Sequence, residues 1–224
     1  MWSLTEKVLD GNNEYSYAHH FRMKRMRVFE EWFSACFLNS QRIHILDLGG
    51  RPEYWNSLHF SQMDKSEITI LNVEETKCTD KTGNFHFVIG DATNLSIYCD
   101  NSFDLCFSNS VIEHVGNNRM QIKMVEEMHR VGKHVYLQTP NYWFPMEPHF
   151  GCLFFHWLPH KVKVWLLMHF ALGWFPKCKS IEEANGIVDS IHLLNYKELK
   201  ALFPNARIYR EKVLWMTKSF YLFE

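Results

Sequence analysis

The chain has 224 residues, of which 46% are hydrophobic, so it is long enough to bury the core of one domain. Its 24 Lys and Arg residues balance 25 Asp and Glu residues, which argues against nucleic acid as the main partner. The sequence contains no apolar run of about 18 residues to cross a membrane, and residues 1–16 lack the apolar stretch of a signal peptide. We therefore expect a cytoplasmic protein that forms a single domain over residues 1–224.

Hydrophobic periodicity predicts a helix at residues 16–38, within an N-terminal helical segment 1–40. Its basic residues are interpreted as a solvated face: Arg22, Lys24, Arg25 and Arg27. Five strands should follow, at residues 43–48, 68–73, 85–89, 103–108 and 134–138. A helix at 118–130 should end at Gly132, as helices often do at a glycine. Strands spaced in this way favour an α/β fold with a parallel sheet, and residues 206–212 and 217–223 should add an antiparallel hairpin at one edge.

Polar or glycine residues follow each of the five predicted strands. In an open α/β sheet the carboxyl ends of parallel strands share one edge, and ligands bind along it. The five clusters are Asp47–Arg51, Asn72–Glu74, Asp91–Ala92, Ser108–Ser110 and Gln138–Asn141. Their regular placement predicts a ligand site at this edge.

The loop after the first strand indicates which cofactor binds there. It reads Gly49-Gly50-Arg51-Pro52, without the G-x-G-x-x-G pattern that a nicotinamide dinucleotide favours. Asp47 and Asp91 are instead suited to a cofactor with a cationic centre and no phosphate groups. S-adenosylmethionine has an ammonium, a sulfonium, a ribose diol and an adenine amine, which acidic and amide groups can bind.

Several motifs resemble those of class I S-adenosylmethionine-dependent methyltransferases, of the group related to ubiquinone-biosynthesis and type 11 methyltransferases. They are ILDLGG at 45–50, ITILNVEE at 68–75, GDATNL at 90–95, FDLCFSNSVIEHV at 103–115 and YLQTPNYWFPMEPHF at 136–150. The resemblance implies a Rossmann-like, seven-stranded, mostly parallel sheet with an antiparallel last strand and helices on both faces.

The same resemblance implies roles for individual residues. The methionine portion of the cofactor would lie near Asp47, Gly49 and Gly50, and the ribose near Asn72 or Glu74. The adenine would lie near Asp91 and Ala92, and the sulfonium above Asn109 and Ser110. The chain departs from the family at residues 51–53, where Arg-Pro-Glu replaces the usual glycine-rich continuation.

The segment that follows the fifth strand predicts the acceptor site. His149 is the candidate catalytic base, because methyl transfer to a hydroxyl requires loss of its proton and a histidine titrates near neutral pH. The candidate acceptor-binding residues are His114, Tyr142, Trp143 and Glu147. Transfer by proximity alone, without a base, is an open alternative. Glu113 could serve the start of a helix or the site. The thirteen histidines are scattered along the sequence, and no metal site is predicted.

Residues 141–195 are expected to form an insertion that covers the substrate. Its stretch 150–175 is rich in aromatic residues, which suits a lid over a small or lipid-linked acceptor, a contact with a membrane surface, or a dimer contact. We expect a methyltransferase that acts on an oxygen, less readily on nitrogen or carbon. A binding protein that has lost turnover and a nicotinamide-dependent oxidoreductase are the alternatives.

Overall fold

The computed structural model describes residues 17–56, 63–75 and 84–224, with the backbone alone for residues 17–19. The first sixteen residues of the predicted N-terminal segment lie outside these ranges. Seven strands form one sheet in the order β3-β2-β1-β4-β5-β9-β8. Their bounds are β1 Ile43–Leu48, β2 Ser66–Asn72, β3 Phe85–Ile89, β4 Phe103–Asn109, β5 Gly132–Pro140, β8 Arg207–Val213 and β9 Met216–Phe223.

The strand directions confirm the predicted fold class. Strands β1 to β5 pair in parallel, and β9 pairs antiparallel with both β5 and β8. Each strand predicted from the sequence is present, with bounds that differ by at most two residues. The carboxyl ends of the parallel strands therefore lie along one edge, as the polar residues after each strand suggested.

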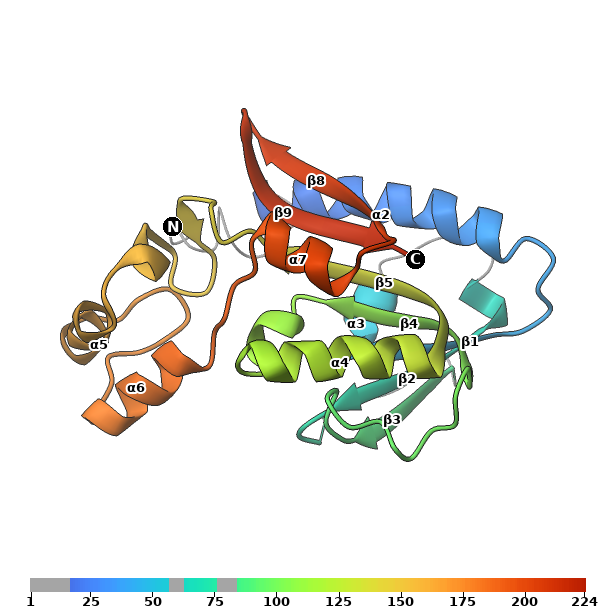
Figure 1. Cartoon of the computed structure of the whole chain (residues 1–224), viewed down its shortest axis with the longest axis horizontal. Coiled ribbons are helices and arrows are strands. Elements are labelled where there is room, and N and C mark those ends of the chain that lie inside the picture. The colour runs from blue at the N-terminus through green and yellow to red at the C-terminus, as the bar shows by residue number, and fades with distance from the viewer. Residues whose placement is uncertain (1–16, 57–62, 76–83) are drawn as a thin grey trace.

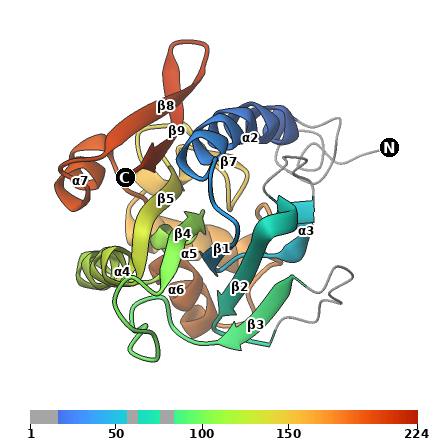
Figure 2. The ribbon, with the colours of Figure 1, turned by 90° about the vertical axis from the view of Figure 1, so that its right-hand side faces the viewer.

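Helices cover both faces of the sheet (Figure 2). On one face lie α2 (Tyr17–Cys36) and the short α3 (Pro52–Asn56), and on the other lie α4 (Asn118–Val131) and α7 (Tyr196–Leu202). Each face has its own apolar core. On the face covered by α2 and α3, Phe29 and Phe33 of α2 pack with Trp55. On the opposite face, Met124 and Met128 of α4 belong to the other core.

One sequence interpretation was wrong. Arg25 does not lie on a solvated face: its side chain is buried, and Nη1 donates to Glu211 Oε2 at 2.6 Å. Gly132 ends α4 as predicted, and its N–H donates to the Met128 carbonyl, but its φ of −103° is extended and needs no glycine. A Cβ at Gly132 would lie 2.7 Å from Cys106 Cβ, so close packing against β4 explains the glycine instead.

Residues 141–195 form a lobe beyond the carboxyl ends of the strands (Figure 1). It contains β6 (Met146–Glu147), β7 (Cys152–Leu153), the 3-10 helix η3 (Phe155–Trp157), α5 (His160–His169) and α6 (Ile181–Asp189). Phe150, Phe155 and Leu167 belong to a third apolar core, which is the lobe's own. In the described part of the chain, no helix is both long and apolar enough to cross a membrane.

Candidate cofactor and acceptor site

Asp47 lies where β1 meets the glycine loop. Its side chain is 1% exposed, and Oδ2 accepts a hydrogen bond from Trp55 Nε1 at 2.6 Å. A Cβ at Gly50 would lie 1.6 Å from Asp47 Oδ2, so only glycine allows the loop to pass this close to the carboxylate. Gly49 has a φ of +72°, and a Cβ there would also meet Val111 at 2.6 Å. Gly49 thus lets the β1 loop pass close to the β4 loop, and Gly50 lets it pass close to Asp47.

The Asp47 carboxyl has an oxygen that could accept a hydrogen bond from a cationic ligand. Burial raises its pKa to about 7, and the hydrogen bond from Trp55 opposes this only in part. Its second oxygen, Oδ1, is buried and has no hydrogen-bond partner among the described residues. An ammonium group would supply the missing partner, so the site fits the charged end of S-adenosylmethionine.

The next two strands supply the expected ribose and adenine positions. Asn72 ends β2, and its Nδ2 donates to the Gly50 carbonyl at 3.1 Å, whereas Glu74 is exposed. Asp91 Oδ1 accepts from Thr93 N–H and from Thr93 Oγ1, each at 2.8 Å. Asn72 therefore braces the glycine loop, and Asp91 is fixed in orientation with its Oδ2 still able to accept a hydrogen bond.

The loop after β4 makes a sharp turn at Ser110. This residue has a φ of +57°, which is costly for a residue other than glycine. Ser110 Oγ donates to Gln138 Oε1 at 2.7 Å, and Ser110 N–H donates to the Gln138 carbonyl at 3.0 Å. The preceding Asn109 has a buried side-chain oxygen without a hydrogen-bond partner in the described chain. The turn thus presents one more acceptor at the cofactor edge.

Next along this loop, the 3-10 helix η2 (Ile112–His114) meets the lobe. His114 Nε2 and His149 Nε2 lie 3.0 Å apart, and His149 Nδ1 lies 2.7 Å from Glu147 Oε1. Glu147 is 1% exposed, and its other oxygen accepts from Phe150 N–H at 2.8 Å. These bonds hold the imidazole of His149 in one orientation, at the junction between the sheet edge and the lobe.

The surroundings shift the pKa values of His114, His149 and Glu113 by different amounts and in different directions. Burial, helped by the neighbouring His149, lowers the pKa of His114 to about 4. Burial also opposes the charge of His149, but the hydrogen bond and charge of Glu147 outweigh it and raise the pKa of His149. Burial raises the pKa of Glu113 to about 7. Of the two imidazoles, His149 therefore has the higher proton affinity.

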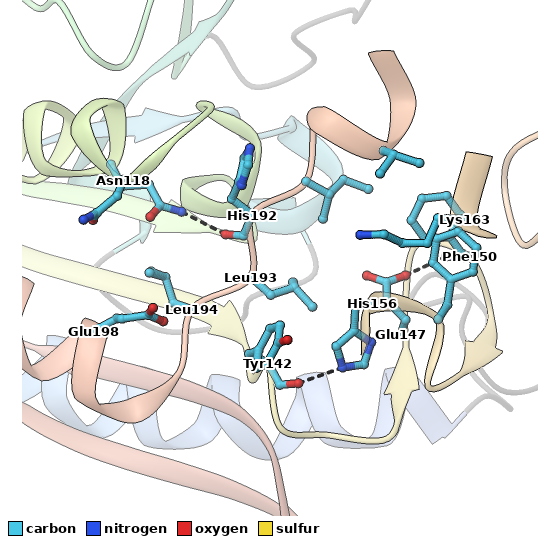
Figure 3. A pocket seen from close by; sticks show the side chains of 14 residues that line it. Asn118, Tyr142, Glu147, Phe150, His156, Lys163, His192, Leu193, Leu194 and Glu198 are labelled. Carbon is cyan, nitrogen blue, oxygen red and sulfur yellow. Dashed lines mark hydrogen bonds between the residues drawn. The ribbon is translucent and has the colours of Figure 1, made fainter. Parts of the chain in front are cut away.

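A cavity of about 390 Å³ opens between the lobe and the amino end of α4 (Figure 3). Tyr142, Glu147, His156 and Lys163 give it polar walls, and Phe150 is among its apolar residues. Lys163 points toward the Glu147 carboxylate (Figure 3), and burial lowers the pKa of this lysine. A ligand with both polar and apolar parts would match this lining.

The predicted site residues are distributed unequally around this junction. Tyr142 and Glu147 line the cavity, and His114 and His149 meet beside Glu147. Trp143 is 63% exposed and is not part of the cavity lining. The cavity residues not predicted from the sequence include His156 and Lys163, which lie in the aromatic stretch and carry no motif.

Residues 52–134 match the family model described as a methyltransferase domain. This segment begins just after the glycine loop and includes Asp91, Asn109 and His114. No curated protein matches the chain.

Solved structures share the fold. Magnesium protoporphyrin IX methyltransferase from Synechocystis PCC 6803 with bound SAH is 8% identical, with 91% of this chain and 83% of that chain covered at a TM-score of 0.54. A SAM-dependent methyltransferase from Archaeoglobus fulgidus is 12% identical, with 92% and 98% covered at a TM-score of 0.51. At these identities the likeness establishes the architecture.

Proposed function

We propose that this chain is a class I S-adenosylmethionine-dependent methyltransferase of the type 11 group and that it transfers a methyl group to an oxygen of a small or amphipathic acceptor. The cofactor supplies a methyl group on a cationic sulfur, which an aligned acceptor atom takes by in-line displacement. Asp47, Gly50, Asp91 and Asn109 are the residues that we expect to hold it.

The observation that carries the oxygen assignment is the pair formed by Glu147 and His149. A buried carboxylate holds Nδ1 of the imidazole at 2.7 Å, so Nε2, which faces His114, is the nitrogen that can assist the loss of an acceptor's proton. An alcohol or phenol oxygen needs this help because it becomes a good nucleophile only as its proton leaves. Uncharged amines and carbanions depend less on a Glu–His pair, because each already has a free electron pair for the attack.

The adjoining cavity supports the class of acceptor. Its volume of about 390 Å³ admits a small molecule, and Glu147 and Lys163 can bind polar groups. Phe150, Phe155 and Val188 supply apolar surface on the same walls. An acceptor with a hydroxylated head and an apolar portion uses both kinds of contact.

The test is methyl transfer from S-adenosylmethionine that carries a labelled methyl group to matched panels of hydroxylated and amine acceptors. We expect product from hydroxylated acceptors, with kcat lower by about 10²- to 10⁴-fold in His149→Gln and an unchanged Kd for the cofactor. The control is His160→Gln, which removes an exposed histidine paired with Asp189 outside the cavity. Equal turnover in His149→Gln, or transfer to amines alone, would contradict the oxygen assignment.

A further inference from the structure

Three side chains with metal-ligating groups meet at the junction of the β4 loop and the lobe. They are Glu113, His114 and His149, and one potential ligand atom from each lies within 4.8 Å of the others. Glu113 and His114 belong to η2, whereas His149 lies 35 residues from His114 in the sequence. The fold creates this cluster, which no spacing in the sequence reveals.

The two imidazoles face each other through Nε2 atoms at 3.0 Å. Because Glu147 Oε1 accepts the proton on His149 Nδ1, neutral His149 has its lone pair on Nε2. The His114 ring makes a hydrogen bond to the backbone of Ser190, and since its Nε2 faces His149, Nδ1 is left for that bond. With both Nδ1 atoms donating, the facing Nε2 lone pairs need a cation beside them, and this is either a proton shared in a hydrogen bond or a metal ion.

Glu113 adds a buried carboxyl group to the same place. Its side chain is fully buried, and Oε2 accepts from Thr139 Oγ1 at 3.0 Å. The other oxygen, Oε1, is buried without a hydrogen-bond partner among the described residues. A buried carboxylate oxygen without a partner is costly, and a bound cation would remove that cost.

We propose that Glu113, His114 and His149 bind a divalent transition-metal ion of the zinc, manganese or iron(II) class. Two imidazoles with one carboxylate are a common ligand set for these ions, whereas calcium and magnesium favour oxygen ligands. Metal–nitrogen bonds of about 2.1 Å place neighbouring imidazole nitrogens about 3.0 Å apart at right angles and about 3.4 Å apart in a tetrahedron. The observed 3.0 Å therefore fits with little movement. Glu147 serves the ligand His149 as the outer carboxylate that fixes its tautomer.

This inference rests on the proposed function and refines it. Three protein ligands leave coordination positions open for an acceptor oxygen. An acceptor hydroxyl bound there loses its proton to water, and its oxygen then bonds to the methyl carbon while the carbon–sulfur electron pair stays on sulfur. When the ion is bound, Nε2 of His149 is one of its ligands, and the ion takes over from the imidazole the task of lowering the pKa of the acceptor hydroxyl.

The test is titration of the full chain, after treatment with a chelator, with Co²⁺ and with Zn²⁺. We expect one ion per chain and visible Co²⁺ absorption, with Zn²⁺ affinity lower by about 100-fold in His114→Gln and in His149→Gln. Glu147→Gln should lower it by about 10- to 100-fold. The control His160→Gln removes a second histidine that pairs with a carboxylate, and should bind the ion as the native chain does.

Absence of Co²⁺ and Zn²⁺ binding by the native chain, or equal binding in His114→Gln and His149→Gln, would overturn the metal site. Cofactor binding to the metal-free chain, measured separately, keeps the two proposals distinct. If the metal-free chain transfers methyl groups at the full rate, the proposed function stands and the metal role falls. If the ion binds but the cofactor does not, the proposed function falls and the metal site stands.

Discussion

The pKa of Asp47 predicts how cofactor affinity depends on pH. Burial raises this pKa to about 7 in the free chain, and the cofactor's ammonium requires the ionised carboxylate. The apparent Kd should then scale as 1 + 10^(7 − pH), so affinity rises about eightfold from pH 5.5 to pH 6.5. Over this range the ammonium itself stays protonated.

Calorimetric titration with S-adenosylmethionine at several pH values measures this change. Asp47→Asn preserves the shape of the side chain and an oxygen for Trp55 Nε1, but removes the charge. It should weaken binding by about tenfold or more at pH 6.5 and flatten the pH dependence. A native chain whose affinity is flat from pH 5.5 to pH 6.5, or an Asp47→Asn chain with native affinity, would refute this role of the carboxyl.

The same shift affects folding in the absence of the cofactor. A carboxyl with a raised pKa contributes stability that is fully present below its unfolded pKa of 3.8 and is lost as pH rises through about 7. Relative to the native chain, Asp47→Asn should therefore gain roughly 3 kcal/mol in unfolding free energy between pH 5 and pH 8. Urea denaturation at the two pH values checks this, and an equal difference at both would contradict the raised pKa.

Three further predictions follow from the fold. Gly50→Ala should abolish cofactor binding in calorimetry, because its Cβ would lie 1.6 Å from Asp47 Oδ2. The control Gly186→Ala lies in α6, where the new Cβ meets no atom within 4 Å. It should stabilise the chain by about 0.5–1 kcal/mol. Retained binding in Gly50→Ala would contradict the close approach. Glu211→Gln breaks a buried ion pair and should lower the thermal midpoint by roughly 6–12 °C for a loss of about 3 kcal/mol, and an unchanged midpoint would contradict this. If the exposed aromatic residues of the lobe touch membranes, Trp165→Ala should reduce sedimentation of the chain with anionic vesicles. The control Trp215→Ala, in the β8–β9 hairpin, should not reduce it. Equal effects of the two variants, or no sedimentation of the native chain, would contradict membrane contact.

The sequence was sufficient to predict the sheet and its ligand edge, because strand patterns and glycines are local signals. The β1 motif placed Asp47 beside Gly50, and the structure shows why only glycine fits there. The antiparallel hairpin at the C-terminus was predicted from two strands, 206–212 and 217–223, that only four residues separate, and the fold pairs them as β8 and β9.

Contacts between distant segments escaped the sequence analysis. Arg25 is buried in an ion pair with Glu211. Because Glu211 lies 186 residues away in the sequence, the helical pattern around Arg25 could not reveal this partner and placed the side chain in solvent. His114 and His149 each stood out singly, but their meeting depends on how the lobe returns to the β4 loop. The helix end at Gly132 was a local signal, whereas its close packing against Cys106 of β4 was not.

The most direct test of the central claim is a crystal structure of the chain with S-adenosylhomocysteine. We expect the ligand at the carboxyl edge of the sheet, with its ammonium at Asp47 and its adenine at Asp91. Failure of the ligand to bind at this edge would contradict the cofactor site and favour a methyltransferase fold that has become a binding protein.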